Sequence, residues 1–124
     1  MFLFIVELVP VFISQPSNPS TVLEGQNLTL QWSYDLDSQT NLLTRITNVT
    51  GGQEGGVVTR SGTNNAIVQA GYENQFIASI SDTEAILTIL TVARSNNEEK
   101  YRLSIIASIN SLTSVDVEIS VLCE

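Results

Sequence analysis

The stretch QNLTLQW, residues 26–32, alternates polar and apolar side chains one by one. Leu28, Leu30 and Trp32 fall on one side of an extended chain, and the polar residues fall on the other. Because successive side chains of a β-strand point to opposite faces, this period of two predicts a strand with one buried face. Trp32, the only tryptophan of the chain, lies on the face that we expect to be buried.

The same alternation occurs in three further stretches, 84–92, 100–107 and 114–122. The residues expected on their buried faces are Leu87, Ile89, Tyr101, Leu103, Ile105, Val115, Val117, Ile119 and Val121. Turn-forming residues separate the stretches, and no helical period persists beyond one turn. We expect about nine strands, with one of the middle ones poorly formed, near residues 9–15, 20–23, 26–34, 41–49, 56–60, 66–70, 75–80, 84–91, 99–108 and 113–122. This pattern predicts an all-β sandwich or barrel.

The composition excludes several classes of function. The 124 residues make one domain, and a hydrophobic fraction of 43% with 15% charged residues is typical of a globular chain. Thirteen acidic and five basic residues give a net charge of −8, which disfavours binding to nucleic acid or to anionic membranes. The chain has no histidine, so Ser-His-Asp and Cys-His catalysis are excluded. We expect no enzymatic activity, no cofactor and no metal site.

Both ends of the chain lie outside the expected domain, which spans residues 11–122. Residues 1–10 are apolar at first and are interpreted as an N-terminal extension or as the remnant of a signal peptide that leads into the first strand. Residues 123–124 are interpreted as the start of a linker. Cys123 is the single cysteine, so the chain can form no internal disulfide. It either pairs with a domain elsewhere in a longer chain or stays a free thiol.

Three stretches together resemble a variable-type domain of the immunoglobulin superfamily. Glu24-Gly25 followed by LTLQW is similar to the family's E-G-x-x-V-T-L-x-C entry into strand B, with Trp32 at the cysteine position. Residues 75–92, QFIASISDTEAILTILTV, resemble its strands D and E. NNEEKYRL is similar to D-x-(A/G)-x-Y-x-C, with Tyr101 as the tyrosine corner and Leu103 at the second cysteine position. The resemblance implies a Greek-key β-sandwich of two antiparallel sheets over residues 11–122.

The chain departs from the family at the centre of the sandwich. Trp32 and Leu103 replace the two cysteines that form the disulfide between strands B and F, and Leu43 stands for the tryptophan of strand C. The resemblance therefore implies a non-covalent pin of Trp32, Leu43 and Leu103 beside Tyr101, whose hydroxyl would bond back to the loop between strands E and F. Burying an indole is of the right magnitude to replace a disulfide.

The likeness also implies a function and a location. Cysteine-poor domains of this kind resemble those of invertebrate surface receptors for adhesion and allorecognition. We therefore expect an extracellular or cell-surface recognition module whose partner is a protein, either another copy of itself or a different one. It would reach a membrane only through an anchor elsewhere in a longer chain. The alternative is a structural immunoglobulin-like domain of a multidomain or matrix protein, without a dedicated ligand. A carbohydrate-binding sandwich is disfavoured, because few aromatic side chains are expected at the surface.

The sheet that contains strands C, F and G offers a candidate interface. If Leu43, Leu103 and Ile105 point inward, the residues that point outward are Leu42, Thr44, Ile46, Arg102, Ser104 and Ile106. Three of these are large aliphatic side chains, which is typical of an interaction patch. The competing interpretation is a face that neighbouring loops cover.

Two glycosylation sequons occur, at Asn27 and Asn48. By its position in the alternation, Asn27 points away from Leu28 and Leu30 and toward solvent. Asn48 ends the expected strand C, just before a Gly-Gly turn. Both asparagines are predicted to carry glycans if the chain is secreted.

Overall fold

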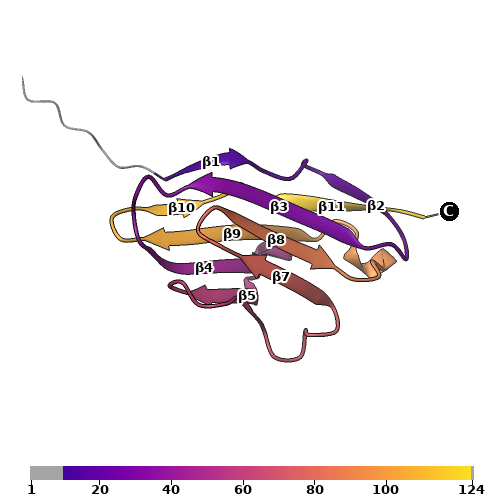
Figure 1. The fold of residues 1–124 in the computed structure, drawn as a ribbon. Helices are drawn as coiled ribbons and strands as arrows, with labels where there is room; N and C mark the ends of the chain where they lie inside the picture. The colour runs from indigo at the N-terminus through magenta and orange to yellow at the C-terminus, as the bar shows by residue number, and fades with distance from the viewer. Residues whose placement is uncertain (1–9, 124) are drawn as a thin grey trace, which may run out of the picture.

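The computed structural model describes residues 10–123, which fold into two β-sheets (Figure 1). The strands are β1 (Val11–Ser14), β2 (Ser20–Leu23), β3 (Leu28–Asp35), β4 (Asn41–Asn48), β5 (Gly55–Ser61), β6 (Ile67–Val68), β7 (Phe76–Ile80), β8 (Glu84–Ile89), β9 (Lys100–Ala107), β10 (Ser111–Thr113) and β11 (Val117–Leu122). Two short 3-10 turns, η1 (Thr50–Gly52) and η2 (Arg94–Asn96), complete the secondary structure. No helix in this part of the chain is long and apolar enough to span a membrane.

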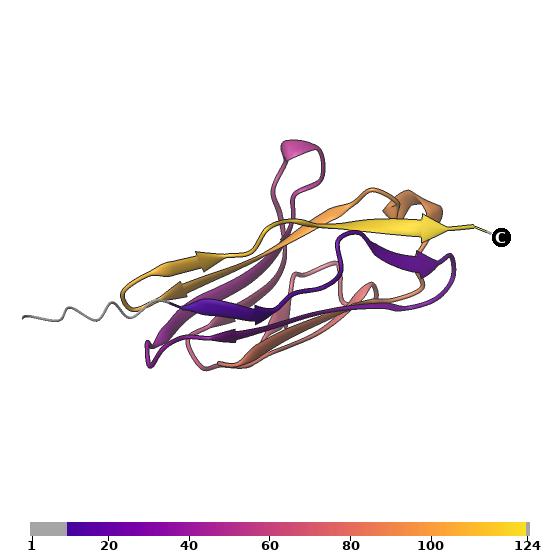
Figure 2. The same ribbon diagram turned by 90° about the horizontal axis from the view of Figure 1, so that it is seen from above.

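The two sheets pack face to face, as Figure 2 shows from above. One has the strand order β1-β3-β8-β7, and the other has the order β2-β11-β9-β4-β5-β6, with β10 also paired to β9. The expected sandwich is therefore confirmed, with one difference in strand direction. The first strand is divided, and its second part, β2, joins β11 in parallel, whereas all other pairs are antiparallel.

The core confirms most of the predicted alternation. Leu30 and Trp32 from β3 are completely buried, as are Leu87 from β8 and Leu103 and Ile105 from β9. Trp32 and Leu103 belong to one cluster of core side chains, which both sheets contribute. A non-covalent centre made of an indole and aliphatic side chains thus takes the position that the resemblance gives to a disulfide.

One member of the predicted pin is wrong. Leu43 lies on the outer face of its sheet and is only partly buried. Ile46 is the β4 residue that enters the core, where it is completely buried and paired in register with Leu103. Leu42 is an extra residue in β4. Asn41 pairs with Ala107 and Leu43 pairs with the adjacent Ile106, so Leu42 has no partner of its own in β9. This β-bulge shifts the alternation along β4.

Tyr101 is buried as predicted, and its hydroxyl bonds back to the loop between β8 and β9, as expected. The hydroxyl donates to the side chain of Glu99, the last residue of that loop, 3.1 Å away. Glu99 also accepts a hydrogen bond from Asn96 in that loop, at 2.7 Å. The Glu99 carboxylate therefore links the tyrosine to η2 within the same loop. Burial of the ring raises the pKa of the Tyr101 hydroxyl, and the charge of Glu99 raises it further.

The last predicted strand is interrupted. Residues 114–116 lie between β10 and β11, and Val115, predicted to be buried, is 69% exposed. Buried Ser114 causes the interruption, since its N–H donates to the Leu103 carbonyl and its hydroxyl accepts from the Leu103 N–H.

The stretch predicted at 66–70 is the two-residue strand β6, which is the poorly formed middle strand that we expected.

The described strands begin at Val11 and end at Leu122. The predicted extension or signal remnant at residues 1–10 lies outside the described residues except for Pro10, and so does Glu124 of the predicted linker.

Candidate functional site

The outer face of the sheet formed by β9, β4 and β5 is the candidate site. Neighbouring pairs across this face are Leu43 with Ile106 and Arg45 with Ser104. These four residues line a shallow depression of about 90 Å³, together with Thr47 and Glu54. We call this surface the outer face below.

Four of the six residues that were predicted to form the interface lie on the outer side of the sheet, and two do not. Leu42 and Ile106 are exposed, at 52% and 41%, and Arg102 and Ser104 are half-buried on the side away from the core. Thr44 and Ile46 were predicted to point outward, and this is wrong, because both are completely buried. The bulge at Leu42 is the reason for the error.

The same error hid two residues that belong to the outer face, Leu43 and Arg45. A signal in the sequence could have revealed them. Arg45 stands two residues after Leu43, so an inward Leu43 would have placed a guanidinium in the core. Burying an unpaired charge is so costly that the opposite orientation should have been preferred.

Arg102 is held rigidly at one side of the outer face. Its Nε and Nη2 donate to the two carboxylate oxygens of Asp116 at 2.7 and 3.1 Å, and its Nη1 donates to Glu54 at 3.2 Å. The hydrogen bonds with Asp116 raise the pKa of Arg102 further above its already high value. This clamp joins β9 to the β4–β5 hairpin and to the segment before β11.

Arg45 is different, because no carboxylate in the described part of the chain lies within salt-bridge distance of it. The other three arginines are all paired: Arg60 with Asp82, Arg94 with Glu24, and Arg102 as described above. Arg45 is exposed in the middle of β4, beside the aliphatic side chains of Leu43 and Ile106. Its guanidinium is available to a partner.

The outer face continues into an ordered apolar tip. Leu42 and Ile106 lie at the end of the sheet near the β9–β10 turn, where Ile109 is 64% exposed. Gln39, from the loop between β3 and β4, accepts hydrogen bonds from the N–H groups of Ile109 and Asn110, each at 3.1 Å. The buried glutamine thereby fixes the turn that presents Ile109.

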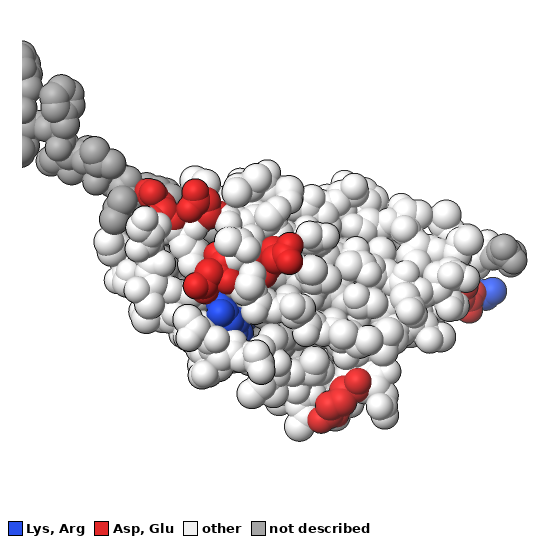
Figure 3. Space-filling view, in the orientation of Figure 1, with Lys and Arg blue, Asp and Glu red and all other residues white. Residues whose placement is uncertain are grey.

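The opposite sheet presents a different surface. Its outward side chains include Asn27, Thr29 and Gln31, all exposed. Viewed from this side, the surface is mostly uncharged, with small groups of carboxylates (Figure 3). The exposure predicted for Asn27 is confirmed, and its Oδ1 accepts from the Thr91 N–H at 2.9 Å.

The second sequon lies in a more closed environment. Asn48 ends β4 as predicted and is half-buried. Its Nδ2 donates to Glu99 at 3.2 Å, and its Oδ1 accepts from both the N–H and the hydroxyl of Thr50.

Within residues 10–123, no group of three or more acidic or cysteine side chains is placed to hold a metal ion.

No family model matches the sequence, and no curated protein matches it either. Solved structures do match. Murine CRIg is 18% identical and superposes with a TM-score of 0.75 over 92% of this chain and 98% of the other. A chain from the structure on T cell specificity and activation by the bacterial superantigen toxic shock syndrome toxin-1 is 17% identical, with a TM-score of 0.74 over 92% and 100% of the two chains. At this level of identity the likeness shows the fold, which is immunoglobulin-like.

Proposed function

We propose that this chain is a variable-type recognition domain of a cell-surface or secreted protein and that it binds a protein partner through its outer face. The strands β5 and β6 support the variable type, because they extend the β9–β4 sheet beyond β4 as the two additional strands of variable domains do. The sequence resemblance to invertebrate receptors for adhesion and allorecognition supports the same class of function.

One observation carries the proposal: on the outer face, and nowhere else among the described residues, an unpaired arginine stands beside exposed or partly exposed aliphatic side chains. Arginine and large apolar residues are enriched at the energetic centres of interfaces. The chain as a whole is strongly acidic, with a net charge of −8, and its other arginines are neutralised in pairs. Arg45 is thus placed to receive a carboxylate of a partner while Leu43 and Ile106 are covered.

The partner that we propose first is a second copy of this chain. Arg45 and Glu54 line the same depression. In a twofold-symmetric pair, each contact occurs twice, so Arg45 of either copy can meet Glu54 of the other. This arrangement would offset the repulsion between two acidic molecules at the point of contact.

Analytical ultracentrifugation over a range of concentrations tests this pairing. The unmodified protein is expected to dimerise, and Arg45→Glu or Ile106→Glu should weaken dimerisation by about tenfold or more. Ile77→Glu is the matched control, since Ile77 is 59% exposed on the opposite sheet and should leave dimerisation unchanged. Ile46→Glu is unsuitable, because it would place a charge in the core.

A charge exchange makes the test sharper. A mixture of Arg45→Glu protein with Glu54→Arg protein should recover pairing that neither variant shows alone. A protein that stays monomeric at all concentrations would refute the second copy as partner. Loss of dimers in the Ile77→Glu control to the same extent would refute the outer face as the contact surface.

A structural unit in an array of domains is the second candidate. The two ends of the described chain, near Val11 and Leu122, lie at opposite ends of the molecule (Figure 1), as end-to-end linkage requires. A structural unit needs no self-association and should tolerate Arg45→Glu without any effect on its behaviour. The ultracentrifugation experiment therefore separates a self-associating recognition domain from a structural unit.

A further inference from the structure

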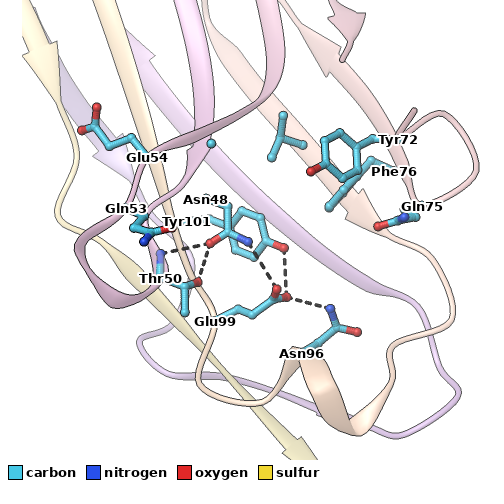
Figure 4. Close-up of a pocket in the computed structure, with 12 residues that line it drawn as sticks. Asn48, Thr50, Gln53, Glu54, Tyr72, Gln75, Phe76, Asn96, Glu99 and Tyr101 are labelled. Atoms are coloured by element: carbon cyan, nitrogen blue, oxygen red, sulfur yellow. Dashed lines mark hydrogen bonds between the residues drawn. The ribbon is translucent and has the colours of Figure 1, made fainter. Parts of the chain in front are cut away.

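A second hollow lies beside the β4–β5 hairpin and the start of β9 (Figure 4). It has a volume of about 360 Å³. The β4–β5 hairpin, the loop between β6 and β7, the turn η2 and the start of β9 surround it, so both sheets contribute to its walls. This volume is within the range of pockets that hold small ligands or single side chains.

Aromatic rings form one side of the hollow. Tyr72 and Phe76 contact each other edge to face, with ring centroids 5.9 Å apart, and Phe76 contacts Tyr101 in the same way at 6.2 Å. Phe76 and Tyr101 are buried in the core, whereas Tyr72 is 40% exposed at the rim. Figure 4 shows Tyr72 and Phe76 across the hollow from Glu99 and Asn48.

The other side carries a fixed carboxylate. Glu99 accepts hydrogen bonds from Asn96 at 2.7 Å, from Tyr101 at 3.1 Å and from Asn48 at 3.2 Å (Figure 4). All three donors are neutral, and no lysine or arginine within the described residues forms a salt bridge with Glu99. The carboxylate is therefore held in place, but its charge is not compensated by a cation.

The remaining lining is also free of positive charge. Among the twelve lining residues are two carboxylates, of Glu99 and Glu54, and no lysine or arginine. The side-chain amides of Gln53 and Gln75 stand at opposite sides of the hollow in Figure 4. A ligand with a positive charge would find aromatic rings on one side and a fixed carboxylate on the other.

We propose that this hollow binds an organic cation, namely an ammonium or guanidinium group that lies between the Tyr72–Phe76 rings and the Glu99 carboxylate. Cations are attracted to aromatic faces, and cages of aromatic rings are a known means of binding quaternary ammonium groups. A neutral ligand would have only the amides and hydroxyls to bind and would gain nothing from the uncompensated charge. This site does not depend on the outer face or on its proposed function.

Nuclear magnetic resonance titration tests the proposal. The isotope-labelled protein is titrated with choline, with the blocked amino acid amides of lysine and arginine, and with the neutral tert-butyl isostere of choline. The cations should give saturable shifts at the amides of Tyr72, Gln75 and Glu99, and these should weaken as salt is added. A preference for choline indicates a small quaternary ammonium ligand, whereas a preference for the blocked lysine or arginine indicates a side chain of a partner protein.

Two variants and a matched control complete the test. Tyr72→Leu removes the exposed ring and should weaken binding of the preferred cation by about three- to tenfold. Glu99→Gln removes the charge, and Glu98→Gln removes the same charge from the neighbouring exposed residue, which does not line the hollow. Glu99→Gln should weaken binding, and Glu98→Gln should not. If Glu99→Gln does not fold, Tyr72→Leu still decides. Equal binding of the neutral isostere, or no saturable shift with any cation, would overturn the proposal.

Discussion

The single tryptophan shows what a side chain must do to replace a covalent cross-link. Burying an indole removes about 150–250 Å² of its surface from water. This burial stabilises the folded state by about 4–6 kcal/mol as an upper estimate. The indole N–H of Trp32 has no hydrogen-bond acceptor in the buried core, which costs about 1–3 kcal/mol. Removing such a disulfide costs about 2–5 kcal/mol. The net gain from burying the indole is therefore of the same order.

Truncating Trp32 should therefore be among the most damaging single changes. Trp32→Ala is expected to destabilise the protein by about 3–5 kcal/mol, measured by urea unfolding, because it leaves a large cavity at the centre of the core. Ile77→Ala on the exposed face of β7 should change the free energy of unfolding by less than about 0.5 kcal/mol. A similar loss in both variants would show that Trp32 does not hold the two sheets together.

The two sequons should differ when the protein is made in a secretory host. Asn27 is exposed and uses only its oxygen in a hydrogen bond, so we expect a glycan there. The Asn48 nitrogen is bonded to Glu99 and faces the hollow, so we expect lower occupancy. Intact-mass spectrometry before and after glycosidase treatment measures both, and Thr29→Ala should remove only the glycan at Asn27. Equal occupancy of the two sites would contradict this expectation.

At the scale of single elements, regular strands could be predicted from the sequence and irregular ones could not. The side chains of β3 and β9 alternate between the two faces without a break, so their buried faces follow directly from the alternation. Strand β4 contains a bulge at Leu42, and such an insertion reverses the faces of all residues on one side of it. Two adjacent leucines gave either orientation an apolar residue, and only the charge of Arg45 distinguished them.

The break before β11 depends on one serine. Ser114→Ala removes the buried hydroxyl that accepts from the Leu103 N–H at 3.3 Å. We expect a loss of about 1–3 kcal/mol in the free energy of unfolding, because a buried donor is left without a partner. Thr113→Ala, one residue earlier and exposed, is the control and should have little effect. If Ser114→Ala also has little effect, the hydroxyl does not stabilise the interruption.

At the scale of the whole molecule, buried tyrosines link stability to alkaline pH. Burial raises the pKa of Tyr34 and Tyr101 above the ordinary value of 10.0, so in both cases the folded state binds the proton more tightly. Their contribution to stability is complete below pH 10 and is lost as the pH rises through the raised values, because the unfolded chain ionises first.

The melting temperature should therefore fall steadily above pH 10, and phenolate absorbance of Tyr34 and Tyr101 should appear together with unfolding. Tyr34→Phe is expected to reduce the slope of this fall, since one linked proton is removed. The variant loses the hydrogen bond from the Tyr34 hydroxyl to the Ser81 carbonyl, so its melting temperature at neutral pH is the reference. An unchanged slope would contradict the assignment.

The candidate sites differ in how far the sequence predicts them. The outer face was half predicted, since β9 alternates cleanly and correctly places Arg102, Ser104 and Ile106. The hollow was not predicted at all. Its walls come from segments as far apart as Asn48, Tyr72 and Glu99, and only the packing of the two sheets brings them together. Neither the alternation of side chains nor the spacing of motifs in the sequence predicts that these segments lie together.

The absence of a cross-link at the centre of this sandwich frees the domain from oxidative maturation. Trp32 and Leu103 are in place once the chain has collapsed, without an oxidase or an isomerase to join them. Glutathione at cytosolic concentrations should leave the fold intact, because Cys123 is exposed at the end of the described chain and bridges nothing there. The domain should therefore be recoverable, correctly folded, from the reducing interior of a bacterial cell.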